Sequence, residues 1–289
     1  MKTDNYFEIV SYNHPEFPIY IEKASMSSLS VLRSHENWHN DIEFAKVLKG
    51  ETIYNVNGRE ILVRKGEGIF INSNQIHYNF SKGDEECVLI CVIFQPLTLC
   101  GDKNIAQKYV SPILKNPDLP YYVLKCENKW ERDIIDNIEK IYDFQKDNHF
   151  ELKFRSLFFD IWYSLYKHMD GIKKAPSLKK GDIEALKKMI SFIHLNYREK
   201  IPLSSLAESA NICKTGVNTL FHKYTGRSPI EYLNYFRLTK SICLMKNTDM
   251  TLTQICYETG FSGASYFAET FKKVFGISPG EYRKLQTGR

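Results

Sequence analysis

The C-terminal third of the chain repeats itself. The stretch FHKYTGRSPIEY at residues 221–232 returns as FKKVFGISPGEY at residues 271–282, with seven of twelve positions identical and a constant offset of fifty residues. Ahead of each stretch the sequence predicts a short helix, a turn and a second helix, which is the spacing of a helix-turn-helix unit. The second helices are expected at residues 214–224 and 263–274. Two copies of this unit predict an all-α C-terminal domain.

Most of the repeated letters specify helix boundaries. Ser228 and Ser278 each stand where a helix begins, followed by proline and then by Glu231 or Glu281 at the third helical position. Such a serine accepts a hydrogen bond from a free backbone N–H of the first turn, and the glutamate bonds back to the serine N–H. Proline suits the first helical position, and the glycine two residues before each serine ends the preceding helix. We therefore interpret the repeat as scaffold.

The charge of the chain is divided unevenly. Residues 172–289 carry 19 lysines and arginines against 9 aspartates and glutamates, a net charge of +10, which leaves −5 for residues 1–171. A basic helical domain suits the phosphate backbone of DNA, although RNA or an acidic membrane surface would attract it too. Between the halves, DGIKKAPSLKKGD at residues 170–182 is rich in Gly, Pro, Ser and Lys, so we interpret it as a linker.

The second helices of the two copies differ on their outward faces. Val217 and Phe221 in the first copy, and Phe267 and Phe271 in the second, form the inner apolar stripe. The outward side chains, which we expect to contact DNA, are Thr215, Asn218, Thr219, His222 and Lys223 in the first copy and Ser265, Tyr266, Ala268, Glu269 and Lys272 in the second. Because these two sets differ, the copies are expected to recognise different base sequences.

The N-terminal half alternates short apolar runs with turn residues from about residue 27 to residue 92. Asn57 and Gly58 stand between two such runs, which is the strongest short signal for a β-hairpin. We predict an antiparallel β-barrel or sandwich, followed by two helices with apolar residues at helical intervals. The predicted fold class is therefore α+β, with an all-α C-terminal domain.

The second of these helices is unusually apolar around Phe158 and Trp162. One of its apolar faces is expected to pack on the barrel and another on a second subunit, giving a homodimer; complete burial within one subunit is the alternative. The expected segments are a sensing domain at 1–128, a helical dimerisation segment at 129–169, the linker at 170–182 and the DNA-binding domain at 183–289.

The sequence predicts neither a membrane span nor an export signal. No uninterrupted apolar run approaches the roughly 18 to 20 residues of a membrane span. The N-terminal stretch MKTDNYFEIV has acidic residues where an export signal needs an apolar core. Seven cysteines without a Cys-x-x-Cys pair fit buried thiols in a reducing compartment. We expect a cytoplasmic protein with no membrane partner.

The stretch GFSGASYFAETFKKVFGISPGEYR at residues 260–283 resembles the signature of the AraC/XylS family of bacterial transcription regulators. The likeness extends over residues 183–289. It implies a seven-helix domain whose two recognition helices enter successive major-groove segments on one face of double-stranded DNA, about 34 Å apart. It also implies transcription activation and contact with RNA polymerase.

The chain departs from the family pattern in both units. The family usually has an Asp-Gln pair where this chain has Gly263 and Ala264, and often an arginine where it has Glu269. A carboxylate accepts from cytosine whereas arginine donates to guanine, so the second half-site is expected to differ from those of relatives. In the first unit, Gly216 lowers the helix propensity and Cys213 stands where a better capping residue is expected. We therefore expect the start of this recognition helix to be weakly held until DNA binds.

The segment NWHNDIEFAKVLKG at residues 37–50 falls on the pattern His-x-His, three residues, Glu, six residues, Gly, except that Asn37 replaces the first histidine. It resembles the cupin-type sensor domain that many of these regulators carry. The resemblance implies a pocket for a small polar effector, such as a sugar, lined by Arg33, Trp38, His39, Glu43 and His77. The alternative is that both histidines are structural. Because one ligand of a metal cupin is missing, we expect no metal ion and no other cofactor.

Two classes of function remain. The first is a ligand-responsive, sequence-specific DNA-binding regulator, more often an activator than a repressor in this family. The second is a metal-dependent cupin enzyme, an isomerase or dioxygenase, with an accessory nucleic-acid-binding domain. A complete double helix-turn-helix is hard to explain in an enzyme, and the cupin pattern lacks a full ligand set. We therefore predict a transcription regulator and not an enzyme.

Overall fold

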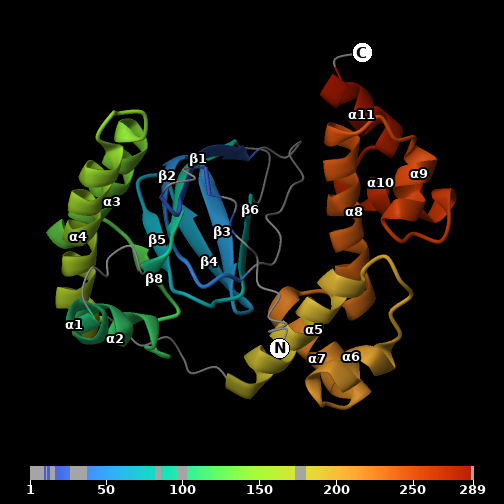
Figure 1. Cartoon of the computed structure of the whole chain (residues 1–289), viewed down its shortest axis with the longest axis horizontal. Coiled ribbons are helices and arrows are strands. Elements are labelled where there is room, and N and C mark those ends of the chain that lie inside the picture. Colours follow the sequence, from blue (N-terminus) through green and yellow to red (C-terminus); the bar gives the residue numbers. More distant parts are fainter. Residues whose placement is uncertain are drawn as a thin grey trace. The chain divides into compact units, whose positions relative to one another are not determined.

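In the computed structural model, the chain divides into two compact units, Phe7–Ser177 and, at the C-terminal end, Leu178–Arg289 (Figure 1). The residues that the structure describes are 10, 12–13, 17–26, 38–81, 86–96, 103–172 and 180–287. Within these ranges, no helix is long and apolar enough to cross a membrane. The six cysteines in the same ranges are free thiols.

The N-terminal unit contains two antiparallel sheets (Figure 1). Its strands are β1 (Ile19–Met26), β2 (Ile42–Lys49), β3 (Glu51–Val56), β4 (Arg59–Arg64), β5 (Gly68–Ile71), β6 (His77–Phe80), β7 (Cys87–Phe94) and β8 (Tyr121–Leu124). One sheet has the order β1-β7-β2-β5-β8 and the other β4-β3-β6. The predicted antiparallel β architecture is confirmed. Among the described strands, no strand pairing joins the two sheets into a closed barrel.

The predicted hairpin joins β3 to β4. Asn57 and Gly58 have φ angles of 52° and 83°, the left-handed pair that a two-residue type I′ turn requires. The Asn57 side chain also bonds to the chain ahead of β6: its Oδ1 accepts from the Ile76 N–H at 3.0 Å, and its Nδ2 donates to Gln75 Oε1 at 2.7 Å. The turn therefore fixes the start of the strand that carries His77.

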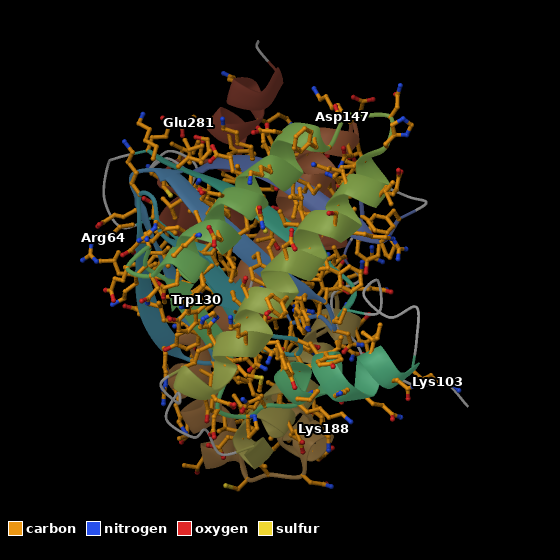
Figure 2. All side chains as sticks on the ribbon, turned by 90° about the vertical axis from the view of Figure 1, so that its left-hand side faces the viewer. Arg64, Lys103, Trp130, Asp147, Lys188 and Glu281 are labelled. Atoms are coloured by element: carbon orange, nitrogen blue, oxygen red, sulfur yellow. The ribbon has the colours of Figure 1, made fainter. Side chains whose placement is uncertain are left out.

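Helices cover the outer face of the five-stranded sheet. They are α1 (Lys103–Ile105), η2 (Ala106–Val110), α2 (Ser111–Leu114), α3 (Lys129–Phe144), α4 (Phe150–His168) and η3 (Met169–Gly171). Figure 2 shows α3 and α4 side by side in front of the sheets, with Trp130 at the start of α3. The two helices predicted for 129–169 are thus present.

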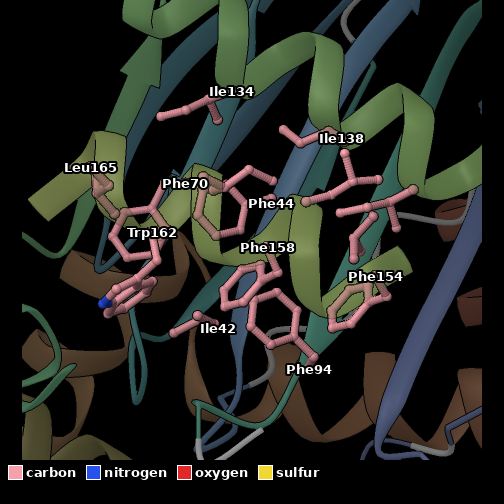
Figure 3. Close-up of a cluster of buried hydrophobic side chains, with 14 of the residues drawn as sticks. Ile42, Phe44, Phe70, Phe94, Ile134, Ile138, Phe154, Phe158, Trp162 and Leu165 are labelled. Carbon is pink, nitrogen blue, oxygen red and sulfur yellow. The ribbon is translucent and has the colours of Figure 1, made fainter. Parts of the chain in front are cut away.

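The apolar face of α4 packs on this sheet (Figure 3). Phe158 lies edge to face on Phe94 with ring centroids 3.9 Å apart, and also contacts Phe44. Phe158 and Trp162 are only 1% and 4% exposed. Phe158 and Trp162 therefore belong to the face of α4 that packs on the sheet, so the dimer expected through this helix would use another of its faces.

A different face of α4 stays exposed. Leu152 is 74% exposed, Phe159 42% and Tyr163 64%, and the spacing of seven and four residues places them on one side of the helix. The helix is therefore apolar on two faces, as the sequence indicated, and the outer one is centred on Phe159.

The C-terminal unit has helices and no strands in its described residues. It contains α5 (Lys180–Asn196), α6 (Leu203–Ala210), α7 (Lys214–Thr225), α8 (Pro229–Asn247), α9 (Leu252–Glu258), α10 (Ala264–Phe275) and α11 (Pro279–Thr287). Helices α6 and α7 form the first helix-turn-helix unit, and α9 and α10 the second. Figure 1 shows the two units beside opposite ends of α8.

The boundaries predicted from the repeat are confirmed. Ser228 and Glu231 form a reciprocal capping box at the start of α8. Ser278 and Glu281 bond in the same way at the start of α11, where the Ser278 N–H lies 2.7 Å from Glu281 Oε2. The glycines at 226 and 276 end α7 and α10 in the left-handed conformation.

Candidate DNA-binding surface and sensor site

The two recognition helices, α7 and α10, present the side chains that the sequence singled out. The residues on the outer faces are Thr215, Asn218, Thr219, His222 and Lys223 on α7 and Ser265, Tyr266, Ala268, Glu269 and Lys272 on α10. All are exposed except Ala268, which is half-buried. The inner stripe of Val217, Phe221, Phe267 and Phe271 is fully buried. The separation into an inner and an outer face is therefore present in both copies.

Three of the outer side chains already make contacts within the protein. Thr219 donates its hydroxyl proton to the Thr215 carbonyl one turn earlier. Lys223 Nζ lies 2.9 Å from Asp182 Oδ2 on α5, so its charge is partly matched before DNA binds. Tyr266 bonds through its hydroxyl to Asn234 of α8 at 2.7 Å. Asn218, His222 and Glu269 are exposed on the same outer faces.

The start of α7 is capped differently from those of α8 and α9. Cys213 is its N-cap and makes no side-chain hydrogen bond to the first turn. At α9, by contrast, Thr251 and Gln254 form a capping box. A capping side chain is worth about 1 kcal/mol, so the first recognition helix starts with less local stabilisation than α8 or α9.

The second helix-turn-helix unit is attached firmly to α8 and to the α5–α6 connection. Arg237 of α8, only 7% exposed, donates to the carbonyls of Tyr197 at 2.7 Å and Glu199 at 2.8 Å. Gly260, at φ +84° in the turn between α9 and α10, lies so close to the Tyr197 carbonyl that an added Cβ would be 2.6 Å from it. We missed Arg237 from sequence; a charged residue inside the apolar run YLNYFRL was the available signal.

The N-terminal unit gathers three titratable side chains. His39 precedes β2, Glu43 lies on β2, and His77 begins β6, so one strand of each sheet contributes. All three are buried, and each offers one ligand atom within 4.8 Å of the others. Trp38, next to His39, is also buried. Arg33, which we expected here, lies outside the described residues, as does Asn37.

Backbone carbonyls fix the orientation of both imidazole rings. His39 Nδ1 lies 3.1 Å from the Asp41 carbonyl oxygen, and His77 Nδ1 lies 2.9 Å from that of Gln75. A carbonyl oxygen can only accept, so both Nδ1 atoms carry protons. The two Nε2 atoms are therefore the ones that face other groups of the site.

The two histidines differ in charge. Burial and the nearby positive charge of His77 lower the pKa of His39 to about 4, so its Nε2 is an unprotonated acceptor at neutral pH. His77 Nε2 lies 3.1 Å from Glu43 Oε2. Because a carboxylate only accepts, His77 donates from this nitrogen as well and is an imidazolium.

Glu43 is a buried carboxylate held in its charged form. Burial alone would raise its pKa, but the hydrogen bond and positive charge of His77 outweigh this and lower it below the usual value. Tyr54 Oη lies 3.5 Å from Glu43 Oε1, and burial followed by the charge of Glu43 raises the pKa of Tyr54 well above normal. The site thus offers one bare nitrogen acceptor, one carboxylate and one cationic donor.

The nitrogen and oxygen atoms that these residues offer are also suitable ligands for a divalent cation. Two imidazoles and one carboxylate are common ligands, and carbonyls bonded to Nδ1 are the usual way in which a protein orients metal-binding histidines. His39, Glu43 and His77 would hold the ion, which would supply a Lewis acid to an adjacent ligand. In the structure, however, His77 and Glu43 bond directly to each other.

Comparison with known proteins agrees with both halves of this description. Residues 206–285 match the model of a helix-turn-helix domain, and residues 32–93 match that of a cupin domain. The HTH-type transcriptional regulator YdeC of Bacillus subtilis is 26% identical over 98% of this chain and 97% of its own length. The HTH-type transcriptional activator RhaS of Mannheimia succiniciproducens is 25% identical over 94% and 96%.

Among solved structures, ToxT of Vibrio cholerae, bound to (E)-4-(8-methylnaphthalen-1-yl)but-3-enoic acid, shares the fold. It superposes with a TM-score of 0.53 at 18% identity, over 93% of this chain and 99% of ToxT. The chain is therefore a transcription regulator with an N-terminal cupin domain and a C-terminal double helix-turn-helix domain. The resemblance to the AraC/XylS family that the sequence indicated is confirmed by these domain matches and relatives.

Proposed function

We propose that this protein is an effector-responsive transcription regulator of the cytoplasm, that it acts as a homodimer, and that it is not an enzyme. The observation that carries the proposal is the pair of recognition helices, which share one buried stripe but expose different side chains. The basic charge of the C-terminal domain supports binding to DNA phosphates. The relative RhaS is named as an activator, so we propose activation, with RNA polymerase as the further partner.

The sensor site supports a small, neutral ligand with hydroxyl groups. A hydroxyl can donate to the bare Nε2 of His39 or to the Glu43 carboxylate and can accept from a nearby donor. A sugar or sugar derivative combines several such groups. A carboxylic acid such as the one bound to ToxT would bring a second negative charge towards Glu43, which is unfavourable in a buried site.

The exposed face of α4 supports dimerisation with a second copy. Glu151 lies in the first turn of the helix and Lys167 in the last. They are equally far from Phe159 along the chain, so in two α4 helices packed antiparallel around Phe159 each glutamate stands at the same level along the helix axis as the partner's lysine, on the flanks of the contact. Burial of the central aromatic residues would supply the apolar contact.

The ligand proposal is tested by thermal unfolding of the full chain with neutral sugars, amino acids, a naphthalene carboxylic acid and zinc or manganese salts. A ligand at a hundredfold its Kd stabilises the folded state by about 2.7 kcal/mol. We expect a sugar to raise the unfolding temperature of the wild type and of the exposed control His149→Gln, but not of His39→Gln. Stabilisation by the carboxylic acid alone would contradict the proposed ligand class.

The DNA proposal is tested by titrating the full chain with duplex DNA at several salt concentrations. We expect affinity to fall steeply with salt, because each phosphate contact releases counterions. Absence of duplex binding at every ionic strength, or a preference for single strands, would contradict it.

A further inference from the structure

Asn234 is a buried polar residue in the middle of the C-terminal domain. It lies on α8, is 7% exposed, and donates from Nδ2 to the Tyr266 hydroxyl at 2.7 Å. Its Oδ1 makes no hydrogen bond. Among the described residues, it is the only buried side-chain nitrogen or oxygen atom without a hydrogen-bond partner. Turning the amide over would leave its NH₂ short of partners instead. An unpaired buried carbonyl destabilises a fold, so an apolar residue of the same shape would suit stability better.

Tyr266 links this buried amide to the recognition surface. It is the third residue of α10 and is 46% exposed. Residues near the start of a recognition helix are those that reach base edges and adjacent phosphates. Because the hydroxyl accepts from Asn234, its own proton remains to be donated. Phosphate oxygens, and the acceptor atoms on base edges, are the groups of DNA that would take it.

The surroundings hold this pair in place. The Phe261 ring lies 6.0 Å from that of Tyr266, and the Arg237 guanidinium lies 5.8 Å above Phe261. Arg237 is fixed in turn by its bonds to the Tyr197 and Glu199 carbonyls. Asn234 therefore connects the start of α10 to a part of α8 that is attached to the α5–α6 connection.

We propose that Asn234 is a positioning residue for DNA recognition, which holds the Tyr266 hydroxyl as a hydrogen-bond donor to an acceptor of the second half-site. The proposal rests on the proposed function in DNA binding. Asn234 itself touches no DNA, and it keeps a half-satisfied amide in the core because that amide orients Tyr266. Its replacement should therefore separate DNA affinity from stability.

The test uses the full chain and a duplex selected by it from a randomised pool. Asn234→Leu and Tyr266→Phe should each lower affinity for this duplex by roughly tenfold, the size expected for one lost contact. The double variant should lose no more than either single variant, because both changes remove the same interaction. The midpoint of unfolding in urea should not fall in Asn234→Leu. Tyr257→Phe, which removes a hydroxyl from an exposed tyrosine of α9, is the control and should bind as the wild type does.

Affinity of Asn234→Leu within twofold of the wild type, or losses that multiply in the double variant, would overturn the proposal. If Asn234→Leu does not fold, Asn234→Ala with Tyr266→Phe completes the same cycle and decides by the same criteria. Selection of no duplex by the wild-type chain would instead refute the proposed DNA-binding function on which the inference rests.

Discussion

The ring of Phe221 meets that of Tyr232 edge to face, with centroids 5.5 Å apart, and the equivalent pair fifty residues later, Phe271 and Tyr282, lies 5.6 Å apart in the same arrangement. The residues that the two copies share therefore make the same contact between a recognition helix and the helix that follows it. What differs between the copies is on the outside. Specificity should follow the outer residues and stability the repeated ones.

Truncation of the repeated phenylalanines should affect folding only. Phe221 and Phe271 are fully buried, so Phe221→Ala or Phe271→Ala should lower the free energy of unfolding of the C-terminal domain by roughly 3 to 5 kcal/mol. Denaturation in urea measures this loss. The base preference of the protein that remains folded should not change; a change would place these residues in the recognition surface.

The sensor domain should lose stability in mild acid. The pKa of His39 is lowered to about 4 in the folded state, whereas the unfolded chain takes up this proton near pH 6.5. The contribution of neutral His39 to the free energy of unfolding is therefore fully present above about pH 6.5. It is lost as the pH falls towards 4, and the loss is on the order of 3 kcal/mol. The lowered pKa of Glu43 acts in the same direction at lower pH.

Thermal unfolding at a series of pH values measures this effect. His39→Gln removes the group that must take up the proton, so its unfolding temperature should depend less on pH between 6.5 and 4. An equal dependence in the wild type and in His39→Gln would contradict the assignment of a neutral His39.

Metal should be dispensable for DNA binding. His77 and Glu43 bond directly to each other, and asparagine stands at 37 where the metal-binding pattern has a histidine. We expect treatment with a chelator to leave DNA affinity unchanged and elemental analysis to find less than one divalent ion per chain. One stoichiometric ion, lost when His39 and His77 are both replaced by alanine, would contradict this prediction.

The outer face of α4 should decide the oligomeric state. Phe159→Glu places a charge at the centre of the proposed interface, so sedimentation should show a dimer for the wild type and a monomer for the variant. Lys153→Glu changes an exposed residue of the same helix that lies outside the apolar row and should stay dimeric. A wild-type monomer near 34 kDa at micromolar concentration would contradict the dimer.

The features that could be predicted from sequence are those set by neighbouring residues. The Asn57–Gly58 turn and the serine–glutamate caps depend on a few adjacent positions, and the structure has them as expected. The sequence could show that α4 is apolar on two faces, but not which face the sheet would cover, because that depends on Phe94, far away in the chain.

The candidate sites divide in the same way. His39, Glu43 and His77 could be found because they follow a spacing pattern, but their protonation depends on carbonyls and burial that only the fold provides. The contact between Asn234 and Tyr266 spans two helices, and no local pattern indicates it. Arg237 was visible as a charge in an apolar run, without an indication of its partners.

The central claim is that the two copies recognise DNA through their dissimilar outer faces, and selection of preferred sequences from a randomised duplex pool tests it most directly. Asn218→Ala and Glu269→Ala each remove an exposed polar group and should change the free energy of unfolding by no more than about 0.5 kcal/mol. Each should weaken discrimination at one base position by about 1 to 3 kcal/mol, Asn218→Ala in one half-site and Glu269→Ala in the other. If both variants select the same sequence as the wild type, the outer faces do not recognise DNA and the account is wrong.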